Sequence, residues 1–286
     1  MATIAAIAAS RKRIAPFRLL RPTTVEALCE SKRQWPDALL HAGGIDLVSR
    51  MKFGLAAPAV IDLGALDEIK GVRQAGDIVE IGAATTHWQI EHDELLKALL
   101  PAVPDFVAGL GNVRVRVQGT IGGNIMAGEP GYEMLPLLAA LDAGLRFVDW
   151  RNGRRRNVPA RGFGVDATDG AYLLAVIAVP LSGKTVTWDR SLRPQLGLIA
   201  AFDWHEGMVV SGFAALTGCG GVWASLPLAR PLSRNDLAAT SGAIAESWGE
   251  LLPPLNGPAE LSRDYCRHVA QVMLRRAITR MAFAST

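Results

Sequence analysis

The chain has 286 residues, a formal net charge of +3, and 50% hydrophobic and 20% charged residues. Its length favours two domains, its composition is that of a folded globular protein, and its small charge gives no support to nucleic-acid binding. No apolar run approaches the roughly 20 residues that span a bilayer. The scattered cysteines Cys29, Cys219 and Cys266 exclude a compact iron–sulfur or zinc motif and indicate a reducing, cytoplasmic compartment.

The first part of the chain alternates between predicted helices and strands. Residues 1–10 are interpreted as a tail and not as a secretory signal, because the basic residues follow the apolar stretch. A helix is predicted to begin near Thr23, with Glu26 in capping-box position, and to end near Lys32. A short helix or turn is predicted over residues 47–53, and helices are predicted over residues 87–100 and 134–142. A second helix is predicted to follow residue 100 and to end near residue 110. Strands are predicted over residues 37–42, 59–63, 77–83, 113–117, 145–150, 155–159 and 171–179.

The composition changes towards the C-terminus. Residues 181–195 are polar and are interpreted as a domain junction. Strands of an antiparallel meander are predicted over residues 197–202, 208–216 and 221–226, and helices over residues 235–248 and 260–281. The last helix is expected to pack through an apolar face that consists of Tyr265, Val269, Val272, Met273 and Ala277.

Two glycine-rich segments are the clearest functional signal. The second glycine segment, residues 118–124, reads Gln-Gly-Thr-Ile-Gly-Gly-Asn and follows the predicted strand 113–117; the first, residues 42–47, reads Ala-Gly-Gly-Ile-Asp-Leu. Glycine leaves the backbone uncovered, so a ligand can approach it closely, and successive N–H groups can bind an anion. One glycine pair would be interpreted as a tight turn, whereas two such loops favour a ligand with two phosphates.

Other motifs are absent or incomplete. The chain has no G-x-G-x-x-G and no G-x-S-x-G, so neither a Rossmann nucleotide site nor a serine hydrolase is supported. His87 and His92 are interpreted as surface or interface residues and not as metal ligands. The cluster of arginines in residues 151–156 is interpreted as a solvated hairpin tip with an Asn-Gly turn. No metal site and no acid–base pair is assigned.

The order of several short segments resembles a known family. They are Arg21-Pro22, residues 42–47 with Met51-Lys52-Phe53, and residues 60–63, 81–86, 120–124 and 138–143. Each is weak alone, but their order and spacing are specific and extend over nearly the whole chain. The chain is similar to the FAD-binding medium subunit of molybdenum hydroxylases, the family of the carbon monoxide, aldehyde and xanthine dehydrogenases.

The resemblance implies an α+β fold. A two-lobed FAD-binding region of vanillyl-alcohol-oxidase (PCMH) type is expected over residues 1–182, with its lobes split near residues 55–60. A smaller α/β C-terminal flavoprotein domain is expected over residues 183–286. FAD is the cofactor expected on this chain, with its diphosphate and ribityl chain held by main-chain N–H groups of the two glycine segments and by the Thr120 hydroxyl.

The resemblance also implies a set of cofactor-binding residues. They are Ala42, Gly43, Gly44, Ile45, Asp46, Leu47, Thr86, Thr120, Ile121, Gly122, Gly123, Asn124, Glu133, Leu174 and Trp188. Leu174 is expected near the flavin ring, and Trp188 is expected to cover it. Three residues depart from the family pattern. Glu133 stands where an aspartate is usual, which moves the carboxylate by about 1.5 Å. Val117 stands where a polar residue is common, and Asp189 stands where a lysine is usual.

The implied function is electron transfer. The chain would take electrons from an iron–sulfur small subunit, beside a large subunit with a molybdenum cofactor, and pass them to an external acceptor. The resemblance implies a heterotrimer, doubled in the complete complex, and no contact of this chain with the organic substrate. Two alternatives stay open: a flavin-free scaffold subunit, suggested by Glu133, Val117 and Asp189, and a free-standing flavin oxidase.

Overall fold

The chain forms two compact units. A computed structural model describes residues 14–164, 170–191, 196–218, 222–253 and 261–283, so the N-terminal tail and Cys219 lie outside the described residues. The first unit contains residues up to Ala127, Gly144–Val158 and Gly164–Ala178. The second contains Gly128–Ala143, Pro159–Phe163 and the residues from Val179 onward. The expected domain boundary at residue 182 stays a prediction.

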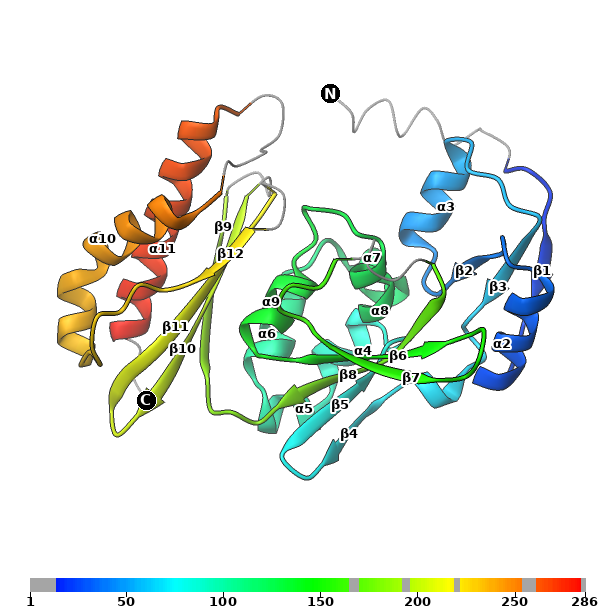
Figure 1. Cartoon of the computed structure of the whole chain (residues 1–286), viewed down its shortest axis with the longest axis horizontal. Coiled ribbons are helices and arrows are strands. Elements are labelled where there is room, and N and C mark those ends of the chain that lie inside the picture. Colours follow the sequence, from blue (N-terminus) through cyan, green and yellow to red (C-terminus); the bar gives the residue numbers. More distant parts are fainter. Residues whose placement is uncertain (1–13, 165–169, 192–195, 219–221, 254–260, 284–286) are drawn as a thin grey trace. The chain divides into compact units, whose positions relative to one another are not determined.

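The N-terminal part of the first unit is a three-stranded parallel sheet with two helices (Figure 1). Its strand order is β1 (Arg18–Leu20), β3 (Ala59–Asp62), β2 (Leu39–His41), and both pairings are parallel. The helices are α2 (Val25–Gln34), between β1 and β2, and α3 (Ile45–Lys52), between β2 and β3. Because the strands are parallel, their carboxyl ends lie at one edge, and the first glycine segment leaves the sheet there.

The start of α2 differs from the prediction by one residue. The Thr24 hydroxyl accepts a hydrogen bond from the Ala27 N–H at 3.1 Å, so Thr24 and not Thr23 caps the helix. Glu26 then lies in the first turn, where its negative charge interacts favourably with the positive end of the helix dipole.

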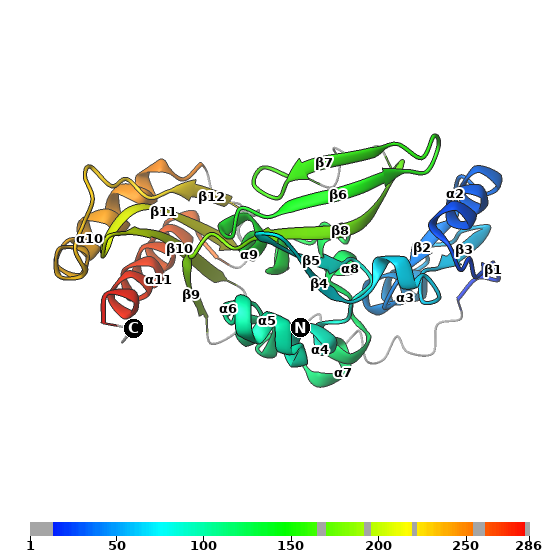
Figure 2. The same ribbon diagram turned by 90° about the horizontal axis from the view of Figure 1, so that it is seen from below.

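The first unit also contains a five-stranded sheet. Its strand order is β4 (Val72–Ala75), β5 (Ile78–Gly82), β8 (Tyr172–Pro180), β6 (Gly144–Asp149), β7 (Arg155–Pro159). Figure 2 shows β8, β6 and β7 side by side, and β6 and β7 form the predicted hairpin. Buried side chains from both sheets share one core, which includes Leu28, Ile61, Leu66, Ile69 and Leu173.

Short helices follow β5 along the chain. They are α4 (His87–His92), α5 (Glu94–Leu99), α6 (Ala102–Ala108), α7 (Val113–Gln118) and α8 (Ile121–Met126). The predicted helix over residues 87–100 is interrupted at Asp93. The Asp93 carboxylate accepts a hydrogen bond from the Leu96 N–H at 2.9 Å and thereby starts α5.

The prediction of a strand over residues 113–117 is wrong, because these residues lie in α7. The Asn112 side chain accepts a hydrogen bond from the Val115 N–H at 3.1 Å and caps the helix. Arg116 pairs with Glu91 of α4 at 2.8 Å, which ties the turn to a neighbouring helix. The alternating valines produce a strand pattern, but local capping and this ion pair override β propensity.

The second unit contains α9 (Met134–Ala140) and a four-stranded antiparallel sheet. The strand order is β12 (Val222–Ser225), β11 (Met208–Thr217), β10 (Gly197–His205), β9 (Thr185–Arg190), which confirms the predicted meander. The interpretation of residues 181–195 as a junction alone is wrong, because β9 lies within them. As an edge strand, β9 keeps polar side chains that hide the strand pattern.

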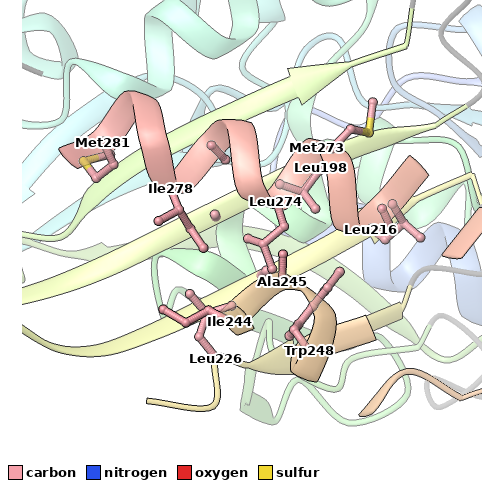
Figure 3. Packing of buried hydrophobic residues seen from close by; sticks show 14 of the residues in the cluster. Leu198, Leu216, Leu226, Ile244, Ala245, Trp248, Met273, Leu274, Ile278 and Met281 are labelled. Atoms are coloured by element: carbon pink, nitrogen blue, oxygen red, sulfur yellow. The ribbon is translucent and has the colours of Figure 1, made fainter. Parts of the chain in front are cut away.

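Two long helices, α10 (Arg234–Leu251) and α11 (Arg263–Phe283), cover one face of this sheet (Figures 1 and 2). Figure 3 shows Leu274 and Ile278 of α11 and Trp248 of α10 gathered with strand residues in the core. The expected burial of Met273 and Ala277 is confirmed, but Tyr265 is 51% exposed. The buried face of α11 is therefore displaced by about one residue from the predicted face.

No helix in the described part of the chain is both long enough and apolar enough to cross a membrane.

The core of the second unit yields a stability prediction. Trp248 is fully buried, and its indole N–H donates to the Ala224 carbonyl at 3.4 Å. Trp248→Ala is expected to lower the free energy of unfolding by about 3–5 kcal/mol, because it leaves a large cavity. Urea unfolding followed by far-UV circular dichroism measures this change. The control Trp88→Ala removes a 40% exposed tryptophan and should change the free energy by less than about 1 kcal/mol; equal effects would contradict the prediction.

Candidate functional site

The two glycine segments meet in the first unit. A Cβ placed on Gly43 would overlap the Gln118 carbonyl oxygen and would lie 2.9 Å from the Gly119 Cα. A Cβ on Gly123 would lie 3.9 Å from the Ala42 Cβ. The backbones of the two segments are therefore in direct contact, and glycine at position 43 is required by this contact.

A third turn, at Thr85 and Thr86, joins the second glycine segment. Thr86 and Thr120 form an isolated antiparallel bridge, and the Thr85 carbonyl accepts a hydrogen bond from the Ile121 N–H at 3.0 Å. Thr86 caps α4, and with Gln89 it forms a capping box that occupies its hydroxyl group. The structure thus brings Thr86 next to the glycine segments, but its hydroxyl already has partners.

The start of α8 satisfies its own backbone donors. Ile121 and Gly122 donate to the carbonyls of Thr85 and Ala83, at 3.0 and 2.8 Å. Gly123 N–H donates to the Thr120 hydroxyl at 3.1 Å, and Asn124 N–H donates to the Thr120 carbonyl at 2.9 Å. The second glycine segment therefore begins a helix, and these four N–H groups have acceptors within the protein. Their expected contacts with the FAD diphosphate and ribityl chain stay a prediction.

The start of α3 is different. Its N-cap is Gly44, in the left-handed region with φ 72°, and no side chain caps its first turn. The first N–H groups of a helix have no intrahelical acceptor, and they bind anions readily. Ile45, Asp46 and Leu47 form this turn and are half-buried. Of the two glycine segments, the first is therefore the one that begins a helix without a capping side chain.

Two buried polar atoms flank the second glycine segment without a hydrogen-bond partner in the described structure, Nδ1 of His87 and Oδ1 of Asn124. A Cβ on Gly119 would lie 3.2 Å from His87 Cδ2. Buried polar groups are nearly always satisfied, so an unpaired one indicates a missing partner. An anionic ligand with hydrogen-bonding groups fits these features together: the bare backbone, the uncapped helix start and the Asn124 amide.

Of the two alternatives for His87, surface or interface, the surface position is wrong, because His87 is only 3% exposed. Burial, and secondarily the Arg116 cation, lower the pKa of His87 to about 4, so the ring is neutral near neutral pH. His92 is exposed, and its Nδ1 lies 2.9 Å from the Trp88 carbonyl oxygen. The difference arises because His87 packs against Gly119, which is distant in sequence.

Leu174 is buried in β8, opposite Phe147 of β6. The carbonyl of the next residue, Ala175, accepts a hydrogen bond from the Ala83 N–H at 2.9 Å. This hydrogen bond joins β8, next to Leu174, to the chain just before the turn at Thr85 and Thr86.

The second unit holds Glu133 and Trp188. Both carboxylate oxygens of Glu133 accept from Arg190 Nε at 3.0 Å. The carbonyl of Trp188 accepts from Arg280 at 3.0 Å, and Arg280 also lies 3.4 Å from the Asp189 carboxylate. Arg190 follows Asp189 in β9 and places its guanidinium beside Glu133.

Sequence reasoning missed the polar residues at the edge of the parallel sheet. Arg21, His41 and Asp62 all stand at or just after the ends of β1, β2 and β3. Their positions directly after short apolar strands were a usable signal, because such ends meet at one edge of a parallel sheet. Within the described part of the chain, no group of three or more His, Cys, Asp or Glu side chains is placed to hold a metal ion.

In the first unit, a parallel sheet leads through a glycine turn into an uncapped helix, and a second glycine segment packs against that turn. Nucleotide-binding domains use such glycine turns and helix starts to bind phosphate groups. Residues 15–182 match the family model of the FAD binding domain in molybdopterin dehydrogenase, and the chain belongs to this family. It is a FAD-binding oxidoreductase subunit of the medium-subunit type, as the resemblance implied.

Known relatives support this assignment. The chain is 30% identical over 287 residues to the carbon monoxide dehydrogenase medium chain of Afipia carboxidovorans, over 92% of this chain and 96% of that one. It is 27% identical over 177 residues to caffeine dehydrogenase subunit beta of Pseudomonas sp. strain CBB1, a match that spans 60% of each chain. Quinoline 2-oxidoreductase from Pseudomonas putida 86 shares the fold, with a TM-score of 0.85 at 22% identity over 94% of this chain and 98% of that one.

The buried His87 yields a pH prediction. Its folded-state pKa of about 4 lies below the ordinary 6.5, so the unfolded chain binds this proton more tightly. Neutral His87 contributes up to about 3 kcal/mol to the free energy of unfolding. This contribution is complete above about pH 6.5 and is lost as the pH falls through about 4. Between about pH 7 and pH 5 the unchanged chain should lose about 2 kcal/mol more than His87→Leu.

Urea unfolding of both proteins at the two pH values measures this difference. His92→Leu is the matched control, because it removes an exposed histidine and should leave the pH profile as it is. Parallel profiles for His87→Leu and the unchanged chain would contradict the assignment of a buried, neutral His87.

Proposed function

We propose that this chain binds FAD across the two glycine segments and is the electron-transfer subunit of a molybdenum-cofactor dehydrogenase. The observation that carries the proposal is the backbone contact between Gly43 and Gln118-Gly119, which lies inside the region that matches the FAD-binding family. Two adjoining bare segments, one at an uncapped helix start, suit a diphosphate better than a single turn does.

The proposal gives the segments different tasks. The diphosphate is assigned to the first turn of α3, where residues 42–47 offer the uncapped N–H groups. The Thr120 hydroxyl and the Asn124 side chain would bind the neighbouring polar groups of the cofactor, while Gly122 and Gly123 keep the backbone bare. Bound flavin can exchange one or two electrons; the protein binds it, orients it and tunes its surroundings.

The flavin end of the site is assigned by family resemblance. Leu174 and Trp188 are proposed to contact the ring, and Glu133 with Arg190 would contribute a paired carboxylate and guanidinium. Thr86 is proposed to act by shaping the turn beside Thr120, since its hydroxyl is occupied in the capping box. None of these residues is given a proton-transfer role.

A mutation at Gly123 tests the cofactor assignment. A Cβ there would lie 2.8 Å from Thr120 Oγ1 and 3.9 Å from the Ala42 Cβ, so a branched side chain fills the space between the segments. Gly123→Val is expected to abolish FAD retention and leave the second unit folded. The ratio of visible flavin absorbance to protein after gentle purification measures retention.

Gly131→Val is the matched control, because no atom lies within 4 Å of a Cβ at Gly131. Normal FAD content in Gly123→Val would mean that the second glycine segment is only structural. Absence of flavin from the unmutated chain would instead support the flavin-free scaffold.

The partners are also part of the proposal. Relatives are named a medium chain of carbon monoxide dehydrogenase and a subunit beta of caffeine dehydrogenase, names of proteins that work with other subunits. We propose an iron–sulfur small subunit and a large subunit with a molybdenum cofactor as partners, in a doubled heterotrimer located in the cytoplasm.

Purification of the tagged chain from its native host tests this assembly. Two further subunits, together with molybdenum and iron by elemental analysis, are expected in the purified complex. A chain that purifies alone with FAD and reduces dioxygen would instead be a free-standing flavin oxidase.

A further inference from the structure

A histidine–carboxylate pair stands at the edge of the parallel sheet. His41 is the last residue of β2 and Asp62 the last residue of β3, and they are register partners in the parallel pairing. His41 Nδ1 lies 3.1 Å from Asp62 Oδ1. The sheet register therefore places the imidazole and the carboxylate side by side.

The pair fixes which ring nitrogen carries a proton. A carboxylate only accepts hydrogen bonds, so Nδ1 must donate to Asp62. Asp62 Oδ1 also accepts from the Gly64 N–H at 3.2 Å, and Arg21 Nε lies 3.6 Å from Asp62 Oδ2. These contacts hold the carboxylate in place, and the carboxylate in turn holds the ring.

The other ring nitrogen points to the start of α3. A Cβ placed on Gly44 would lie 2.5 Å from His41 Nε2, so Nε2 occupies the open side of the N-cap residue. The His41 side chain is 32% exposed, and a group bound on the first turn of α3 can therefore reach it. This is the turn whose N–H groups have no capping side chain.

We propose that His41, held by Asp62, is a binding residue for the FAD diphosphate and acts as an imidazolium. With Nδ1–H donated to Asp62, only the doubly protonated ring can also donate from Nε2 to a phosphate oxygen. Near pH 8, where an ordinary imidazole carries no charge, such a contact requires the uptake of one proton on binding. This inference rests on the proposed FAD-binding function and adds to it a charged contact and a linkage to protons.

The surrounding charges are consistent with this role. At the sheet edge, Asp62 lies beside the ring and Arg21 lies beside the Asp62 carboxylate. The acidic residue in the first turn of α3 is Asp46, whose carboxylate lies 3.5 Å from Arg50. His41 is thus the charged donor at the start of α3 whose ring nitrogen lies over Gly44, while Arg50 is engaged with Asp46.

Calorimetric titration of the full chain after removal of FAD tests the proposal with three ligands: FAD, ADP, which carries a diphosphate, and adenosine, which carries none. His41→Leu is expected to weaken FAD and ADP by about 10- to 100-fold, the usual effect of losing a charged hydrogen bond. Adenosine affinity should not change. Titrations near pH 8 in buffers of different ionisation enthalpy should show proton uptake with FAD for the unchanged chain and none for His41→Leu.

Two further variants separate the roles. His41→Gln keeps a neutral donor and should bind ADP with intermediate affinity and without proton uptake. His92→Leu removes an exposed histidine of α4 and should behave like the unchanged chain.

Unchanged ADP affinity and proton uptake in His41→Leu would overturn the inference alone. Equal weakening of ADP and adenosine, with a lower melting temperature, would also overturn it, because the ring would then only fill the space above Gly44. If the unchanged chain binds neither FAD nor ADP, the proposed function and this inference fail together.

Discussion

The contact between the Gly43 backbone and the Gln118-Gly119 peptide is the constraint on which the first unit depends. It brings a turn of the parallel sheet against a turn between two short helices, so any side chain at position 43 would force the segments apart. Gly122 is held in the same way, because a Cβ there would lie 2.7 Å from the Ala83 Cβ. The glycines in these segments therefore serve chain packing first, and the bare surface for a ligand is a result of that packing.

The two helix starts at this contact are alike in sequence and unlike in structure. The start of α8 satisfies its N–H groups with Thr120, Thr85 and Ala83, whereas the start of α3 has no capping side chain. Of the two helix starts, the one at α3 therefore keeps the N–H groups without a capping side chain. In the proposed site, the second glycine segment would contribute its shape and its side chains more than its backbone N–H groups.

Much of the fold was predictable because its signals are local. The strands near residues 77–83, 145–150 and 171–179 follow alternation or apolar runs, and the ordered glycine segments identify the family. Residues 113–117 were mispredicted, because capping by Asn112 and the Arg116–Glu91 pair outweigh a valine pattern. β9 was missed because an edge strand tolerates polar side chains.

The site was less predictable than the fold, because its features depend on contacts between distant segments. His87 is buried by Gly119, and the α8 amides bond to the turn after β5. The pairing of His41 with Asp62 follows from a parallel register that no single stretch of sequence contains. Residue types at strand ends suggest a site, but only the register shows which side chains meet.

The internally bonded start of α8 has a consequence for how the cofactor comes and goes. A segment whose donors are already satisfied keeps its shape without a ligand, so its conformational entropy is lost during folding and not during binding. The N–H groups that a cofactor could still satisfy are then those at the start of α3. After departure of the cofactor, the second glycine segment would remain as a pre-organised template for rebinding.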